Sequence, residues 1–574
     1  MNIRNIFFLL VTGFAILFPS SSFAANNPVG FNVHLHQRFP ASTYEETTDE
    51  IADEGFKWAR EEFTWSTIEA EDDAFDFSRY DAVIDAYQNA DMKVLGLLTY
   101  SATWSSTDSS DGYEFYPPQE DEWREYVRTV VAHYEGQVDH WEIWNEPNDA
   151  HFWRGSDEEY AEILLAAYEE IKDVNSDAKV IMGGTAGVDS AFFRTICTAL
   201  DGAKAFDIVG VHQYRENEGS VTYSPEAMEN GLDSLLAQLW GFRRAVTDCT
   251  GNNTAIWITE FGWPTNETGA TGVSEKRQRN YMMRYITQAM TVPGVKKAFV
   301  YEWKDSGDEA TDHEDHFGVV NRDGDHKKAV AGLALINKQL HKAEFKKVHH
   351  LKNDLEDVVV DGADWSITHK ENATGALSFE DDVVEFSYDF TSADNSYVTA
   401  EMQGIAGEKK QLAFEVRAEG GPEMLRIRVE DAEGETFQYT VGTVMEEWAT
   451  VFLPLTTSYY TSWGGDEDGK IDMPLQAVSF VADDKDHAPQ VSGTIYLKNI
   501  QMIGNPAVFA YKFKKRNRLM IIAWATKSKL VKFRSVRWGS HKFVRLAGTA
   551  VKDKNKYFTR RLRPALQIIR PPKK

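Results

Sequence analysis

The sequence predicts an α/β fold, namely a (β/α)8 TIM barrel followed by all-β accessory domains. Over residues 25–342, eight apolar, β-branched or aromatic runs alternate with amphipathic helical stretches. After residue 340 the hydrophobic pattern changes to a period of two, in short segments separated by Gly, Asp and Asn turns. A doubly wound sheet would need fewer strands, and no GxGxxG or Walker sequence follows a strand. The barrel is therefore the better fit to residues 25–342.

The alternating runs have the lengths expected of barrel strands and helices. The expected strands are 29–36, 56–61, 92–100, 138–146, 179–186, 208–214, 255–263 and 296–304. The helical stretches are 78–90, 118–134, 157–174, 231–248 and 274–290, and Ser156 to Glu159 form a capping box before the third. Eight strands that alternate with helices over about 300 residues are typical of a (β/α)8 barrel.

The charge of the chain is unevenly distributed. The 574 residues carry a net charge of −28, yet residues 506–574 hold 21 Lys and Arg against one acid, Asp553. This tail is thus at +20, and the rest of the chain is at −48. An acidic body of this size repels nucleic acid and favours solubility, so we expect no nucleic-acid partner.

The N-terminal 24 residues are typical of a signal peptide. Arg4 supplies a positive charge, residues 6–18 are apolar, and Ser22-Phe23-Ala24 fits a cleavage site. An uncleaved anchor is the alternative, although the apolar run is shorter than the roughly 20 residues of a membrane span. We therefore expect an exported protein, secreted or periplasmic, without a membrane span. In an oxidising compartment Cys197 and Cys249 can form a disulfide, and two buried thiols are the alternative.

The fourth expected strand ends in Trp144-Asn145-Glu146-Pro147-Asn148. Pro147 cannot continue a central strand, so Glu146 lies at the strand's end. There an amide can bind a sugar hydroxyl, an indole can stack on a sugar ring, and a carboxyl can donate a proton. Alternatively, Glu146 only caps the segment that follows.

A second carboxylate, Glu260, closes the seventh expected strand in Thr259-Glu260-Phe261-Gly262-Trp263. The carboxyl ends of barrel strands meet at one face, where the active sites of such barrels lie. Six of the eight strand ends carry polar or aromatic residues suited to a sugar, which is hard to explain by capping alone. These residues are Arg60, Trp104, Asn145, Glu146, His212, Tyr214, Glu260 and Trp303.

The pairing of residues 144–148 with residues 259–263 resembles the retaining glycoside hydrolases of clan A. Over roughly residues 28–340 it is most similar to glycoside hydrolase family 39 and its relatives that cut bacterial exopolysaccharide. The resemblance implies that Glu146 is the acid/base and Glu260 the nucleophile. It further implies substrate-binding roles, with Asn145 at the hydroxyl beside the anomeric carbon, Arg60 and Tyr214 holding Glu260, His212 on the substrate and Trp303 as the floor of the subsite. Trp104 is also expected to bind substrate.

The loop 305–316 departs from the family pattern because it is long, acidic and histidine-bearing. Residues 313–316 read His-Glu-Asp-His, which invites a metal site. Adjacent residues do not easily converge on one ion, and a ligand spacing such as HxxxH is absent. We expect a solvated loop over the cleft, no metal and no cofactor.

The accessory region predicts two further domains. Residues 352–505 predict a β-sandwich that resembles carbohydrate-binding jelly rolls, in which Trp463, Tyr459 and Tyr460 could stack on sugars. A structural domain with these aromatics in its core is the alternative. In family 39-like enzymes a small β-domain packs beside the barrel, and residues 343–351 plus 506–574 fit that arrangement. Its positive charge could dock on the acidic body or hold an anionic polysaccharide.

The sequence therefore predicts an exported retaining glycoside hydrolase that acts on a polysaccharide. Endo-action is favoured by the aromatic strand ends and the extra sandwich, and the alternative is an exo-acting, β-xylosidase-like enzyme. A non-catalytic carbohydrate-binding or matrix protein on an inactive barrel is an alternative of another class. The presence of both glutamates argues against that last alternative.

Overall fold

The computed structural model describes most of the chain from residue 26 onward. The described residues are 26–214, 224–226, 235–250, 254–266, 272–348, 355–357, 365–380, 383–390, 396–403, 411–420, 423–444, 448–455, 461–483, 492–503, 508–516, 518–525, 529–534, 541–544, 550–553, 557–562 and 566–570. The expected signal peptide, and Tyr459 and Tyr460, lie outside them.

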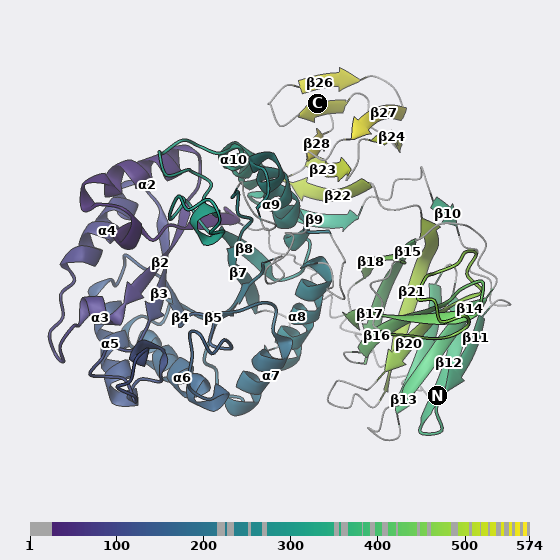
Figure 1. Ribbon diagram of the computed structural model, residues 1–574, viewed down its shortest axis with the longest axis horizontal. Coiled ribbons are helices and arrows are strands. Elements are labelled where there is room, and N and C mark those ends of the chain that lie inside the picture. Colours follow the sequence, from purple (N-terminus) through teal and green to yellow (C-terminus); the bar gives the residue numbers. More distant parts are fainter. Residues whose placement is uncertain are drawn as a thin grey trace, which may run out of the picture.

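Eight parallel strands form a closed barrel in chain order, which confirms the predicted fold class (Figure 1). They are β1 (Val29–Asn32), β2 (Trp58–Thr64), β3 (Lys93–Thr99), β4 (His140–Ile143), β5 (Lys179–Thr185), β6 (Ile208–His212), β7 (Ala255–Phe261) and β8 (Val295–Val300). The strands are buried on both faces, as parallel strands covered by helices must be.

Helices surround the barrel (Figure 1). They are α1 (Leu35–Arg38), α2 (Tyr44–Asp53), α3 (Trp65–Ile68), α4 (Ser78–Asn89), α5 (Glu120–His133), α6 (Asp157–Val174), α7 (Ser190–Ala199), α8 (Leu235–Thr250), α9 (Glu275–Ala289) and α10 (Lys328–Leu340), with short 3-10 turns η1 (Ala41–Thr43), η2 (Tyr113–Phe115) and η3 (Glu314–His316). The predicted capping box of α6 is present, since Ser156 Oγ accepts from Glu159 N and Glu159 Oε2 accepts from Ser156 N. Within the described part of the chain, no helix combines the length and apolarity that a membrane crossing requires.

The amino-terminal end of the barrel is closed by an aromatic layer. Trp58, Trp257 and Phe299 pack together there with Leu95, Ile181 and Ile208. Lys297 Nζ lies 3.9 Å from the centroid of the Trp58 ring and donates to the Asn26 carbonyl at 3.0 Å, so this buried amino group has a hydrogen-bond partner. With this end sealed, the carboxyl ends of the strands are left as the open face.

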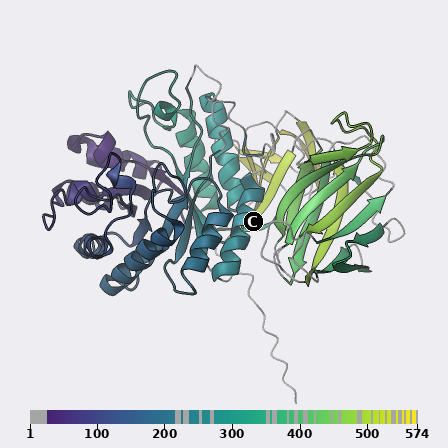
Figure 2. The same cartoon turned by 60° about the horizontal axis from the view of Figure 1, so that its bottom comes forward.

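A sandwich of two antiparallel sheets follows the barrel. One sheet has the order β12-β13-β21-β15-β18, with β10 beside β21, and the other has the order β11-β14-β20-β16-β17-β19. The strands are β10 (Leu355–Asp357), β11 (Trp365–His369), β12 (Ala373–Glu380), β13 (Val383–Phe390), β14 (Tyr397–Gln403), β15 (Gln411–Glu419), β16 (Glu423–Glu430), β17 (Glu435–Val444), β18 (Ala449–Pro454), β19 (Thr461–Gly464), β20 (Ala477–Asp483) and β21 (Ser492–Ile503). Their inward side chains form a separate core, and the sandwich lies to one side of the barrel (Figure 2).

The end of the chain returns to the barrel. Its sheet has the order β26-β25-β28-β23-β22-β9, and β24 pairs with β27 beside it. The strands are β9 (Ala343–Val348), β22 (Val508–Lys515), β23 (Arg518–Ala525), β24 (Lys529–Arg534), β25 (His541–Val544), β26 (Ala550–Asp553), β27 (Tyr557–Leu562) and β28 (Gln567–Arg570). Tyr511 and Trp524 belong to the barrel's own hydrophobic core, and Gln288 of α9 donates to the Tyr511 hydroxyl at 3.3 Å. The strand directly after the barrel thus shares a sheet with the chain's last strands.

Candidate active site

The segment that carries Glu146 is not an extension of the fourth strand. Strand β4 ends at Ile143, and both Trp144 (φ 66°) and Glu146 (φ 44°) adopt the left-handed backbone region. Non-glycine residues rarely do so, and such strained positions often lie at functional sites. The Glu146 N–H donates to the Gly184 carbonyl at 3.0 Å, and the Trp144 indole donates to the Phe152 carbonyl at 2.8 Å. These bonds fix the turn that aims Glu146 across the barrel mouth.

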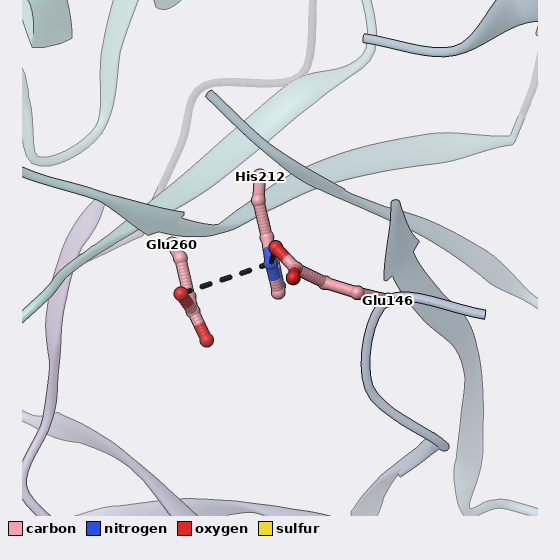
Figure 3. Close-up of side chains that lie close together, drawn as sticks. All are labelled: Glu146, His212 and Glu260. Atoms are coloured by element: carbon pink, nitrogen blue, oxygen red, sulfur yellow. Dashed lines mark hydrogen bonds and ion pairs between the residues drawn. The ribbon is translucent and has the colours of Figure 1, made fainter. Parts of the chain in front are cut away.

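The two candidate catalytic carboxylates face each other across a histidine (Figure 3). His212, the last residue of β6, places Nδ1 2.7 Å from Glu146 Oε1 and 3.7 Å from Glu260 Oε2. One carboxylate oxygen of each glutamate and a ring nitrogen of His212 all lie within 4.8 Å of one another. The Glu146 and Glu260 side chains remain 14% and 12% exposed, while His212 is fully buried. Both carboxylates can therefore reach one bound molecule.

Glu260 lies on β7 and is held in its ionised form. Arg60 Nη1 donates to Glu260 Oε1 at 2.8 Å, and the Tyr214 hydroxyl donates to Oε2 at 2.6 Å. Burial alone would raise the pKa of Glu260, but the charges of His212 and Arg60 and the Tyr214 hydrogen bond hold that pKa below its ordinary value. Glu260 has the charge and the partial exposure that a nucleophile needs.

Arg60 is the centre of a buried polar network. Its Nε donates to Glu142 Oε2 at 2.6 Å and its Nη1 to Asn32 Oδ1 at 2.8 Å. Its Nη2 donates to Asn145 Oδ1 at 3.1 Å, which orients that amide beside Glu260. Burial opposes the charge of Arg60, but Glu142 and Glu260 raise its pKa further above its ordinary value. The guanidinium therefore fixes strands β1, β2, β4 and β7 at the point where the site forms.

The His212 side chain is closely confined by neighbouring residues. A Cβ at Gly184 would lie 2.3 Å from His212 Nε2 and 2.5 Å from Thr259 Oγ1, so only glycine fits beside the imidazole. Burial disfavours the charged ring, yet Glu260 and Glu146 raise the pKa of His212 above its ordinary value. Both carboxylates thus favour the protonated form of the imidazole that lies between them.

The structure differs from the expectation for Trp303. Strand β8 ends at Val300, and Trp303 is only 1% exposed, with its ring 4.9 Å from that of Phe31 in the core. It therefore cannot be the floor of a subsite. Tyr301, two residues earlier, is half-buried, and its ring lies 6.2 Å from that of Tyr214, the partner of Glu260. Tyr301 is therefore the aromatic after β8 that lies beside Tyr214, on the Glu260 side of the site.

Trp104 lies farther along the rim. It is partly exposed, its indole donates to the Glu69 carbonyl at 3.3 Å, and its ring lies 5.7 Å from that of Trp65. These contacts place it against the turn that follows β2, and not against the glutamate pair. Of the eight expected residues, six are therefore brought together: Arg60, Asn145, Glu146, His212, Tyr214 and Glu260.

Several site residues have no counterpart in the sequence prediction. Asn32 and Glu142 are buried polar residues inside otherwise apolar strands, a signal that was available in the sequence. His34 follows β1 with φ 54°, and within the described residues neither of its ring nitrogens has a hydrogen-bond partner. Burial, aided by Arg38 and Arg60, lowers the pKa of His34 to about 3, so its ring is neutral. No local pattern marks His34 as part of the site.

Glu302, two residues after the end of β8, is a further buried acid. It is fully buried, and its Oε2 lies 3.0 Å from Arg38 Nε. Burial, together with Asp305 and Glu314, outweighs Arg38 and raises the pKa of Glu302 to about 8. Glu302 is therefore a protonated neighbour of the site at neutral pH.

Ion pairs and ring contacts hold the histidine-bearing loop, residues 305–316, and the residues after it. Lys327 Nζ pairs with the buried Asp305 at 2.7 Å, and His313 pairs with Glu314 at 3.2 Å. The Phe317 ring lies 5.8 Å from that of Tyr214 and 6.1 Å from that of His313. The loop therefore reaches the wall beside Glu260 and is more than a solvated cover.

The trio of Glu146, His212 and Glu260 is compact enough to raise the question of a metal ion. A metal-bound imidazole must be neutral, whereas both carboxylates raise the pKa of His212. Arg60 also lies 2.8 Å from Glu260 and supplies the positive charge that a cation would bring. These charges favour proton chemistry over metal binding.

A disulfide joins Cys197 in α7 to Cys249 in α8. It encloses a sequence separation of 52 residues, which includes β6 with His212. The cross-link therefore ties together two helices that flank the strand carrying the central imidazole.

Comparison with known proteins finds similarity to glycoside hydrolases. A family model described as cellulase (glycosyl hydrolase family 5) matches residues 22–295. A curated beta-xylosidase from Caldicellulosiruptor saccharolyticus is 31% identical over 183 residues, which are 29% of this chain and 37% of that protein. The chain thus spans little more than a third of that relative's length. Both matches support a glycosidase and confirm the resemblance to clan A glycoside hydrolases.

Two solved structures are similar across most of the chain. A family 39 glycoside hydrolase from Bacteroides cellulosilyticus WH2 is 17% identical with a TM-score of 0.47, covering 80% of this chain and 81% of that one. A monomeric beta-xylosidase from Caulobacter crescentus CB15 is 14% identical with a TM-score of 0.44, covering 83% and 98%.

Proposed function

We propose that this protein is a retaining glycoside hydrolase in which Glu260 is the nucleophile and Glu146 the acid/base. The observation that carries the proposal is the approach of the two carboxylates, whose nearest oxygens lie within 4.8 Å of one another and of His212. Retaining enzymes hold their carboxyl groups about 5–5.5 Å apart, whereas inverting enzymes need about 6.5–9.5 Å to admit a water. A separation below 4.8 Å between the nearest carboxylate oxygens fits the closer, retaining arrangement.

In the first step Glu260 attacks the anomeric carbon as the glycosidic C–O bond breaks. The departing oxygen takes the proton of Glu146, and a covalent glycosyl-enzyme ester forms on Glu260. Arg60 and Tyr214 keep Glu260 ionised and aimed before the attack. The Asn145 amide, whose Oδ1 is occupied by Arg60, can donate Nδ2 to the hydroxyl beside the anomeric carbon.

In the second step the roles of the two glutamates change. Glu146, now ionised, takes a proton from a water molecule, and that water attacks the anomeric carbon and releases Glu260 as a carboxylate. When Glu260 forms the ester it loses its negative charge. Of the two glutamates beside the His212 imidazole, Glu146 is then the one that carries a negative charge. Two inversions give net retention.

We further propose that the enzyme is exported, acts on a polysaccharide and cuts within the chain. The signal-like N-terminus supports export, and an additional sandwich on the same chain supports a polymeric substrate. An exo-acting β-xylosidase-like activity is the second candidate, because the curated relative is a beta-xylosidase. The exopolysaccharide of a bacterium is the polymer that the sequence resemblance favours.

A digestion screen with analysis of product size tests these proposals. Early release of oligomers supports endo-action, and release of monomers alone from the chain end supports the exo-acting candidate. Glu146→Ala and Glu260→Ala should each abolish hydrolysis and retain a wild-type thermal unfolding profile, whereas Glu162→Ala, an exposed glutamate of α6, should remain active. Full activity in either site variant overturns the assignment, and a wild-type chain inactive on every glycan favours the non-catalytic alternative.

A further inference from the structure

The outer face of one sandwich sheet carries a small groove. It has a volume of about 190 Å³ and crosses β11, β14, β20, β16, β17 and β19, most of which are labelled in Figure 1. Its lining includes Thr368, Tyr397, Glu401, Arg428, Glu430 and Trp463. It belongs to the sandwich and shares no residue with the glutamate pair of the barrel.

The period-two pattern of the strands explains why this face is polar. On β14, Val398, Ala400 and Met402 are buried in the sandwich core, so Tyr397, Thr399 and Glu401 point to the other face. The partner strands place further polar side chains beside them, among them Ser479, whose hydroxyl donates to Glu401 at 3.1 Å. The groove is therefore built by the sheet itself and not by mobile loops.

Two aromatic rings and a guanidinium shape the groove. Arg428 Cζ lies 5.0 Å from the centroid of the Tyr397 ring and 5.6 Å from that of the Trp463 ring. The Gln438 side chain accepts from Arg428 Nε at 2.8 Å and fixes the guanidinium between the two rings. Trp463 nevertheless remains 44% exposed, which leaves a ring face for a ligand.

Polar groups complete the groove. The Thr399 hydroxyl is buried and, within the described residues, has no hydrogen-bond partner. A buried hydroxyl left without a partner costs free energy, so a ligand that satisfies it gains affinity. The carboxylates of Glu401 and Glu430 can accept hydrogen bonds from hydroxyls, and together they outweigh the single charge of Arg428. This charge balance disfavours an anionic ligand.

We propose that this groove is a binding site for a neutral glycan, separate from the active site. Trp463 stacks on the face of a sugar ring, and Thr399, Glu401 and Arg428 bond its hydroxyl groups. A short stretch of one polysaccharide chain fits the volume, whereas a protein partner would need a much larger contact area. Among the described residues that line a second, wider hollow of about 640 Å³ on the opposite sheet, the one aromatic is Tyr388, which is 2% exposed and cannot stack on a ring.

The site can be tested independently of catalysis in the full-length chain with Glu260→Gln. Native affinity electrophoresis in gels containing soluble β-glucan, galactomannan or arabinoxylan measures retardation by neutral glycans, and a gel with polygalacturonate measures an anionic one. Phe379 on β12 is a matched control, because it is an aromatic of similar exposure, 42%, on the other sheet.

The expected result is retardation by at least one neutral glycan. Trp463→Ala should weaken that binding at least about tenfold, Trp463→Tyr should retain most of it, and Phe379→Ala should bind as the parent does. Unchanged binding by Trp463→Ala, an equal loss with Phe379→Ala, no binding to any neutral glycan, or binding to polygalacturonate alone would each overturn the proposal. Because the parent lacks the nucleophile, none of these outcomes depends on the proposed hydrolysis.

Discussion

Nδ1 of the buried His212 lies 2.7 Å from Oε1 of Glu146, the carboxylate proposed to donate a proton to the departing sugar. The same nitrogen is 3.7 Å from Glu260, so one imidazole contacts both members of the pair. We infer that His212 positions Glu146 and controls where its proton lies.

The His212→Asn variant tests this role. Loss of the imidazole should slow glycosides with poor leaving groups by about 10²-fold or more, because their departure needs proton donation. Glycosides with activated aryl leaving groups need little acid assistance and should slow much less. The ratio of kcat/KM values for the two substrate types measures the effect. His133→Asn, which removes an exposed histidine paired with Asp81 at 2.7 Å, should leave that ratio unchanged.

The Tyr214→Phe variant tests how Glu260 is kept ionised. Removal of the 2.6 Å hydrogen bond should raise the pKa of Glu260, because the Tyr214 hydroxyl stabilises the carboxylate form. The acidic limb of the pH profile of kcat/KM should therefore move to higher pH, and the maximum should fall by roughly 10- to 100-fold. Tyr511→Phe removes a buried hydroxyl that accepts from Gln288, away from the site, and should leave the profile in place. An unshifted acidic limb in Tyr214→Phe would contradict the role.

The Arg60→Met variant tests the buried network. It leaves Glu142, which is fully buried, without its cation, and this should lower the free energy of unfolding by about 3–5 kcal/mol. The exposed pair of Lys93 and Asp139 provides the control, since Lys93→Met should cost at most about 1 kcal/mol. Denaturant unfolding measures both. If Arg60→Met and Lys93→Met lost the same free energy of unfolding, Arg60 would serve the active site alone and would not stabilise the fold through the buried network.

The Glu302→Gln variant tests a pH dependence of stability. Glu302 has a pKa of about 8 in the folded protein against an ordinary value of 4.5, so between these values the folded state holds a proton that the unfolded state has lost. This group therefore lowers stability as pH rises from about 4.5 to about 8, by at most about 1.4 kcal/mol per pH unit. In Glu302→Gln that loss of stability should disappear. The free energy of unfolding of the variant should therefore exceed that of wild type by the largest amount near pH 8. If the free energies of unfolding of the variant and of wild type differed by the same amount at every pH, the predicted effect of Glu302 would be refuted.

The barrel, and the meeting of six of the eight expected residues at one face, could be predicted from the sequence because both follow from simple periodicities. Strands that alternate with helices close into a barrel, and the carboxyl ends of parallel strands then meet, whatever their distance along the chain. That is why Arg60 and Glu260, 200 residues apart, could be expected together. The glutamate of β4 was expected at the strand end itself, whereas the strand stops at Ile143 and a left-handed turn presents Glu146.

The failures come from the chain beyond the strand ends. Trp303 was expected in the cleft by its position in an apolar run, but β8 stops at Val300 and the chain then turns, so Tyr301 and not Trp303 borders the site. His34 likewise lies in a left-handed turn after β1, where no periodicity applies. Strand pattern predicts where a site lies, while the side chains that line it depend on turns.

The central claim is that Glu260 forms a covalent bond to the sugar. A 2-deoxy-2-fluoro glycoside with an activated leaving group slows the second step more than the first, so a glycosyl-enzyme accumulates and can be located by peptide mass mapping. The account predicts one sugar per chain, attached to Glu260, and no label in Glu260→Gln. Attachment to any other residue, or products with inverted anomeric configuration, would contradict it.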